Sequence, residues 1–266
     1  MKLLRKMVLK LLKATAFDTT IKHHHTNGKF FLNSYSHKGY WYHGANRESN
    51  TVKIFNSWIK PGDFVLEIGG HIGYFTTFYA AKVGKNGKVD VFEPSDKNAK
   101  YLHRNINFLP ADLKNIVTVV DKGAGDVNKV MDFYIDPISG QNNSFVEDFE
   151  GFFSSRENSA VKYVEPIKES VNVITLDSYF ENVQRLPDFV KIDVEGFEWN
   201  VIQGFVRTID NAHPSLMIEI QADSDKLIPF FKERNYTIYN DRLEEVIGLQ
   251  DYATKKTPNM FFRFNQ

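Results

Sequence analysis

The sequence contains no cysteine, so it offers neither disulfide bonds nor thiolate ligands for a metal, and a reducing compartment is expected. Its 33 basic and 33 acidic residues balance, which leaves no overall charge to attract nucleic acid. No apolar run reaches the roughly 18 residues that a membrane-spanning helix needs. These absences predict a cytoplasmic chain that neither crosses a membrane nor binds nucleic acid.

Basic and apolar residues recur at helical spacing in the first 14 positions, MKLLRKMVLKLLKA, and the first acid is Asp18. The lysines interrupt every apolar stretch that could serve as a signal peptide, so none is expected. Two interpretations stay open. The helix lies on an anionic membrane surface, at the inner face for a cytoplasmic protein, or it packs its apolar face on the rest of the chain.

Strand-like and helix-like stretches alternate along residues 51–266, which predicts one α/β domain with a mostly parallel central sheet and helices on both faces. Residues 1–50 are expected to form the amphipathic helix and an aromatic, lid-like extension. Within that extension, three histidines at 23–25 predict an exposed loop, and residues 29–41 a strand or lid. The irregular stretch 136–166 is too long for an ordinary connection and is interpreted as an acceptor-binding insertion.

The stretch 63–94, DFVLEIGGHIGYFTTFYAAKVGKNGKVDVFEP, reads as a strand, a glycine turn, a helix and a second strand. Gly69, Gly70 and Gly73 allow the backbone to turn tightly and to approach a ligand. Glu93 ends the second strand about 20 residues after Gly73, the spacing expected of an acid that binds a ribose. These features predict a nucleotide-binding unit.

The glycine turn follows the pattern E-x-G-G-x-x-G and not G-x-G-x-x-G, because His71 and Tyr74 stand where the second pattern requires glycine. A dinucleotide pyrophosphate would meet those side chains and the nearby carboxylate of Glu67. That carboxylate would instead attract the cationic aminoacyl end of S-adenosylmethionine. The turn therefore favours S-adenosylmethionine. An NAD-linked oxidoreductase and a non-catalytic, membrane-docked module that binds a cofactor remain the alternatives.

Acidic residues end four predicted strands, and in an open α/β sheet such ends meet at the ligand-binding edge: Glu67, Glu93, Asp193 and Glu219. Glu195 follows Asp193 by two residues, so the two side chains point the same way if the backbone is extended there. Paired carboxylates hold cations, accept protons or bind divalent ions. Asp193 and Glu195 are candidate bases, with His71 a further one. Asp193, Glu195 and Glu219 are also candidate ligands for a divalent metal.

Six stretches in order resemble the FkbM-type family of S-adenosylmethionine-dependent methyltransferases: VLEIGGHIGYFT (65–76), VFEPS (91–95), RNI (104–106), ITLDSYF (174–180), VKIDVEGFEWNVIQG (190–204) and LMIEI (216–220). The resemblance spans about residues 50–264, and KIDVEG is its most specific element. The chain departs from the family at His71, where members commonly carry asparagine.

The resemblance implies a Rossmann-like methyltransferase fold and O-methylation of a hydroxyl on a sugar, glycan, lipid-linked or secondary-metabolite acceptor. It implies that Asp193 and Glu195 face the sulfonium and the acceptor, and that Glu93 binds the ribose. Gly123 and Ala124 would lie at the adenine. The complete set of residues expected to bind the cofactor is Glu67, Gly69, Gly70, His71, Gly73, Tyr74, Phe75, Glu93, Pro94, Ser95, Gly123, Ala124 and Asp193.

Overall fold

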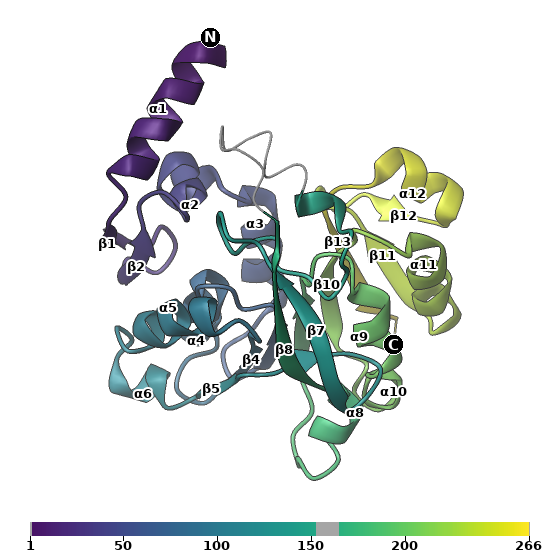
Figure 1. The fold of residues 1–266 in the computed structure, drawn as a ribbon. Helices are drawn as coiled ribbons and strands as arrows, with labels where there is room; N and C mark the ends of the chain where they lie inside the picture. Colours follow the sequence, from purple (N-terminus) through teal and green to yellow (C-terminus); the bar gives the residue numbers. More distant parts are fainter. Residues whose placement is uncertain (1, 153–164, 266) are drawn as a thin grey trace.

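The computed structural model describes residues 2–152 and 165–265. An eight-stranded sheet lies at its centre, in the order β12-β11-β13-β10-β9-β3-β4-β5 (Figure 1). The five strands from β10 to β5 are parallel, and β13 runs antiparallel to both of its neighbours. This arrangement confirms the predicted α/β class. The strands are β3 (Phe64–Ile68), β4 (Lys88–Phe92), β5 (Val117–Val120), β9 (Phe189–Ile192), β10 (Ser215–Glu219), β11 (Tyr236–Tyr239), β12 (Glu245–Val246) and β13 (Asn259–Phe264).

Helices cover both faces of the sheet because its strands are apolar on both sides. Successive side chains of a strand point to opposite faces. Val190 therefore packs with Phe205 and Phe231 on one face, and Phe189 packs with Phe55 on the other. The helices of the domain are α3 (Ser49–Trp58), α4 (Tyr74–Val83), α5 (Asp96–Ile106), α6 (Ala111–Lys114), α8 (Leu176–Tyr179), α9 (Glu198–Gln203), α10 (Val206–Ala212), α11 (Ser224–Glu233) and α12 (Leu249–Lys255).

The chain reverses its direction of travel across the sheet between β3 and β9. It proceeds from β3 to β4 and β5 on one side, and from β9 to β10 on the other. Ligands bind beyond the carboxyl ends of strands at such a switch point. Here the turn after β3 packs directly on the end of β9. Gly69 has a φ of +87°, and a Cβ added there would lie 1.9 Å from the carbonyl oxygen of Asp193, so only glycine fits.

A smaller sheet beside the central one contains β6 (Gly123–Ala124), β8 (Ile167–Ile174) and β7 (Lys129–Ile135) in that order. Strand β8 pairs in parallel with β6 and antiparallel with β7. Two short helices, α9 and α10, follow β9. They separate at Gly204, where an added Cβ would lie 1.9 Å from the oxygen of Gly125. This close approach of two backbones has no signature in the local sequence.

The N-terminal extension consists of α1 (Lys2–Ala14), the hairpin β1 (Asp18–Lys22) and β2 (Lys29–Asn33), α2 (Lys38–His43) and a 3₁₀ turn at Gly44–Asn46. Residues 29–41 are therefore a strand followed by a helix. Phe30, Leu32 and Tyr40 join the core that covers α4, whereas α1 projects away from the domain (Figure 1). Among the described residues, no helix is both long and apolar enough to cross a bilayer.

The expectation of an exposed histidine loop is wrong for His23, which is buried against α4. Its Nε2 lies 3.0 Å from the carbonyl oxygen of Tyr74, and its Nδ1 accepts hydrogen bonds from the backbone N–H groups of His25 and Thr26. Because a carbonyl only accepts, Nε2 must carry the proton. Burial lowers the pKa of His23 to about 4. The imidazole is thus a neutral structural group.

His37 is a second buried neutral imidazole, since its Nδ1 accepts the Asn33 N–H at 2.9 Å and burial lowers its pKa to about 3. The unfolded chain binds a proton near pH 6.5 and the folded chain does not, so stability is lost as pH falls below 6.5. Asparagine in place of His37 keeps an acceptor oxygen without titrating. Between pH 7.5 and 5 we expect the wild type to lose about 2 kcal/mol more than His37→Asn in urea unfolding.

The wild type alone would not reveal the effect of His37 on the free energy of unfolding. Glu67 and Glu93 have raised pKa values, so they stabilise the folded chain at lower pH and act against the effect of His37. Those contributions are common to wild type and variant and cancel. His103→Asn, at an exposed position on α5, is the control and should follow the wild type. Equal pH dependence in wild type and His37→Asn would show that His37 does not resist protonation.

Candidate active site

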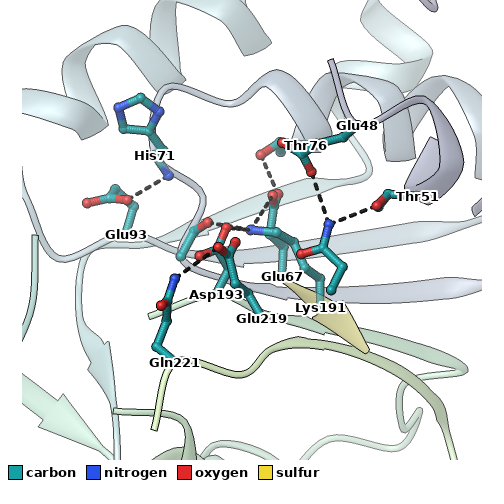
Figure 2. A network of polar contacts seen from close by, with 12 residues as sticks. Glu48, Thr51, Glu67, His71, Thr76, Glu93, Lys191, Asp193, Glu219 and Gln221 are labelled. Carbon is teal, nitrogen blue, oxygen red and sulfur yellow. Dashed lines mark hydrogen bonds and ion pairs between the residues drawn. The ribbon is translucent and has the colours of Figure 1, made fainter. Parts of the chain in front are cut away.

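A buried lysine lies between two carboxylates at the switch point. Lys191 on β9 is the direct neighbour of Glu67 on β3. Its Nζ lies 3.8 Å from Glu67 Oε1 and 3.0 Å from Asp193 Oδ2, and it donates to the Gly69 carbonyl at 3.0 Å (Figure 2). Thr76 of α4 donates to the other oxygen of Glu67 at 2.6 Å. One ammonium group thus joins two strand ends and the glycine turn.

The charges of this group depend on one another. Burial raises the pKa of Glu67 to about 7, although Lys191 and Thr76 act in the other direction. Burial by itself would lower the pKa of Lys191, but Asp193 and Glu67 together hold it above its ordinary value. Lys191 therefore stays cationic and fixes the carboxylate of Asp193 in place. Sequence reasoning missed Lys191; its signal was a single lysine inside the apolar strand of DFVKIDV.

Two further acids crowd Asp193. The charge of Asp193 is the main reason that the pKa of Glu219 lies well above its ordinary value, with burial second. Burial, followed by Asp193, raises the pKa of Glu195 in the same way. Gln221 donates to Glu219 at 3.0 Å. Since repelling carboxylates are relieved by positive charge, this edge is suited to a cationic ligand.

The backbone conformation at Glu195 differs from the expected one. Strand β9 ends at Ile192, and Glu195 has a φ of +55°, so the extended geometry that was to align it with Asp193 is absent. Ser144 holds this turn by donating to the Glu195 carbonyl at 2.6 Å. In the part of the chain that the structure describes, no three His, Asp or Glu side chains are arranged to hold a metal ion. The geometry gives no support to the predicted metal role of Asp193, Glu195 and Glu219.

Glu93 ties the glycine turn to the start of α5. It accepts the backbone N–H of His71 at 2.7 Å, that of Ser95 at 3.0 Å and the side-chain amide of Asn98 at 3.4 Å. Burial raises the pKa of Glu93 to about 7. Glu93 lines the narrower of the two cavities described below, where the ribose is expected. Its three hydrogen bonds also give the carboxylate a structural role, because they hold the glycine turn.

His71 adopts a left-handed conformation with a φ of +48°, a region in which asparagine, aspartate and histidine are enriched among non-glycine residues. Histidine can therefore stand where family members commonly carry asparagine. Its Nδ1 lies 3.0 Å from the hydroxyl of Tyr40, within hydrogen-bond distance. Burial, with the nearby His37 second, lowers the pKa of His71 far below its ordinary value. A base with so low a pKa accepts protons weakly near neutral pH.

Two cavities that share lining residues lie at this edge of the sheet. The wider one, of about 460 Å³, is lined by residues that include Glu67, Tyr74, Phe75 and Lys191. The narrower one, of about 60 Å³, is lined by residues that include Glu93, Pro94, Gly123 and Ala124. Both are lined by Gly69, His71, Gln141, Asp193 and Glu195. Asp193 therefore stands at the junction.

Most residues expected to bind the cofactor line one of these cavities, and Gly70 lines the wider one. Gly73 and Ser95 line neither. Gly73 begins α4 in a left-handed conformation, and an added Cβ there would lie 2.7 Å from Leu102. Ser95 caps α5 by accepting the Asn98 N–H. These two residues position the starts of α4 and α5 beside the cavities without lining the cavities themselves.

The wider cavity is also lined by polar residues that sequence reasoning missed, because nothing in the stretch ANRESN (45–50) marks it as part of a site. Arg47 pairs with Glu48 at 3.4 Å, and its guanidinium lies over the Tyr40 ring. Asn259, at the start of β13, donates to Thr51 at 2.8 Å and to Glu48 at 3.4 Å. The side-chain oxygen of Asn259 is buried without a hydrogen-bond partner among the described residues.

The described part of the expected insertion, residues 136–152, lies over both cavities. Asn98 donates to the Gly140 carbonyl at 3.0 Å, and Phe145 packs between Phe133 and Phe197. The polar run 141–143 between these anchors lines the cavities. Residues 153–164 of the insertion lie outside the described part of the chain, and its acceptor role stays a prediction.

The Methyltransferase FkbM domain model matches residues 67–238, which is well over half of the chain and includes the end of β3, all of α4 and all of β9. The chain belongs to the FkbM methyltransferase family. This assignment confirms the resemblance seen in the sequence and replaces the alternative of an NAD-linked oxidoreductase. No curated protein matches the chain.

Three solved structures are similar to this FkbM chain. An FkbM methyltransferase from Methylobacillus flagellatus KT is 18% identical, with a TM-score of 0.45 over 75% of this chain and 43% of that one. An S-adenosylmethionine-dependent O-methyltransferase from Thermotoga maritima is 14% identical, with a TM-score of 0.43 over 83% and 66%. Fibrillarin from Aeropyrum pernix, solved with bound S-adenosylmethionine, is 10% identical, with a TM-score of 0.42 over 77% and 68%. The chain spans less than half the length of the Methylobacillus protein.

Two features of this FkbM chain fit S-adenosylmethionine. First, Gln141 and Asn143 line the narrower cavity, and their side-chain amide nitrogens are buried without a hydrogen-bond partner among the described residues. Such donors suit the acceptor nitrogens of a purine or the oxygens of a ribose. Second, the crowded carboxylates around Asp193 suit an ammonium and a sulfonium. The residues that line the narrower cavity would contact one edge of the adenosine, and the junction would take the cationic end.

Proposed function

We propose that the chain is an S-adenosylmethionine-dependent O-methyltransferase acting on a hydroxyl of a sugar, glycan, lipid-linked or similar polyhydroxylated acceptor. The observation that carries the proposal is the position of Asp193, which lines both a narrow cavity with amide side chains and a wider, polar cavity. A hydroxyl in the wider cavity would then lie within reach of both a methyl donor and a carboxylate.

S-adenosylmethionine, when bound, supplies an electrophilic methyl group. The residues of the chain hold the acceptor and take its proton. Lys191 orients the Asp193 carboxylate through their 3.0 Å contact, so that this carboxylate can accept the hydroxyl proton as the oxygen attacks. Glu195, which lines both cavities, is the second candidate for this step. Positioning of two substrates supplies most of the remaining acceleration.

The charge of the wider cavity favours an acceptor without anionic groups. Two cationic side chains line it, Arg47 and Lys191, and both are paired with acids. The acidic side chains that line it are more numerous: Glu48, Glu67, Asp193, Glu195, Glu219 and Asp241. A phosphorylated acceptor would be repelled, whereas hydroxyl groups could bond to acids and amides. Neutral or amino sugars fit this lining.

The test is methyl transfer from labelled S-adenosylmethionine to fractionated neutral glycans, with phosphorylated sugars as a parallel set. We expect label in the neutral set, in a product that survives mild alkali because the new bond is an ether. Label released by alkali would indicate a methyl ester, and label on nitrogen would indicate an N-methyltransferase. Either result would contradict O-methylation of a hydroxyl.

A further inference from the structure

The projecting helix α1 carries an exposed apolar face. Met7 and Leu11, one helical turn apart, are 61% and 66% exposed, and Val8 beside them is also exposed. None of the described elements covers this face, and Figure 1 shows α1 extending away from the domain. One of the two expectations from the sequence, packing of the helix on the domain, is therefore not met by residues 7–11.

Exposed aromatic residues continue the apolar surface at the base of α1. Phe17 and Trp41 both bond to Ser34: the Ser34 N–H donates to the Phe17 carbonyl at 2.9 Å, and the Trp41 indole donates to the Ser34 carbonyl at 2.8 Å. Tyr42 is 74% exposed, and its ring lies 6.4 Å from that of Trp41. Tryptophan and tyrosine are enriched where proteins meet the boundary between lipid and water.

Positive charge is concentrated on the same element. The first 17 residues hold five basic and no acidic residues, so the rest of the chain carries 28 basic and 33 acidic ones. The body of the protein would be repelled by an anionic bilayer, whereas α1 would be attracted to it. A basic helix with an exposed apolar face and adjacent aromatics has the composition of an interfacial membrane helix.

We propose that α1, Phe17, Trp41 and Tyr42 form a docking surface for the headgroup region of an anionic lipid bilayer. Apolar side chains enter the interface, and the lysines and arginine contact the lipid phosphates. Helix α2 connects this surface to the active site, because Tyr40 lines the wider cavity while Trp41 and Tyr42 face outward. Docking would therefore hold the mouth of the site near the membrane.

The experiment is co-sedimentation of the full chain with vesicles of phosphatidylcholine alone or mixed with phosphatidylserine. We expect binding only to the mixed vesicles and weaker binding as salt rises, since salt screens the charges. Leu11→Glu should reduce binding by about tenfold or more, because it places a charge in the apolar face. Ile247→Glu, equally exposed but beside β12 at the far edge of the sheet, should bind as the wild type does.

Several results would overturn the proposal. Equal binding of wild type to both vesicle types would remove the role of charge, and wild-type binding by Leu11→Glu would remove the role of the helix. Absence of vesicle binding, with a dimer that Leu11→Glu dissociates, would assign the surface to a second copy of the chain. Thermal unfolding of both variants establishes that they are folded. Because no methyl transfer is measured, the outcome is independent of the proposed reaction.

Discussion

Replacing Asp193 with asparagine should lower the turnover of methyl transfer by about 100-fold or more, the usual contribution of a positioned general base. Asparagine preserves the shape of the side chain at the junction of the cavities and removes its charge and basicity. The fold should persist, because Lys191 retains Glu67 at 3.8 Å and the Gly69 carbonyl at 3.0 Å as partners. Affinity for S-adenosylmethionine, measured by calorimetry, should change less than turnover.

A matched control for this charge removal is Glu169→Gln, at an exposed position on β8, which should leave turnover unchanged. If Asp193→Asn retains near-normal turnover, Asp193 is not the base. Glu195→Gln then becomes the decisive variant, since Glu195 lines both cavities and has a raised pKa. His71→Ala would follow, although the low pKa of His71 predicts a smaller effect.

Replacing Lys191 with methionine should destabilise the folded chain by about 3–5 kcal/mol, because removal of one partner leaves the buried carboxylate of Glu67 without its cation. Glu67 would respond by holding its proton to a higher pH, since burial already raises its pKa to about 7. An acid whose folded pKa is raised loses stability as pH increases. The variant should therefore unfold at a lower temperature at pH 8 than at pH 6.

The double variant Lys191→Met with Glu67→Gln separates loss of the cation from a packing defect. Glutamine cannot ionise and still accepts the Thr76 hydroxyl, so it should restore part of the stability and abolish the added pH dependence. Calorimetric unfolding of wild type, both single variants and the double variant gives the coupling energy. A Lys191→Met chain that unfolds like the wild type at both pH values would show that the buried ion pair does not stabilise the fold.

The residues that sequence reasoning identified most securely lie at strand ends. Glu67, Glu93, Asp193 and Glu219 interrupt apolar runs, and parallel strands bring their carboxyl ends to one edge, so their convergence was predictable. The expected alignment of Asp193 and Glu195 was not obtained, because it assumed an extended backbone. The φ of +55° at Glu195 depends on packing of the turn, including the Ser144 bond from a segment 51 residues earlier.

By itself, the sequence determined the α/β class, the glycine turn after the first strand of the domain, the family and the acids at the ends of the strands. These properties reside in local patterns: apolar runs of strand length, glycines at fixed spacing, and the KIDVEG element. Only the tertiary structure decided that Lys191 neutralises Glu67 and Asp193, that His23 and His37 are buried neutral groups, and that Asn259 and Arg47 face the same cavity. Each of these depends on contacts between residues far apart in the chain, and burial there alters their charge. A local sequence pattern does not specify which residues a side chain contacts after folding or how exposed it is to solvent.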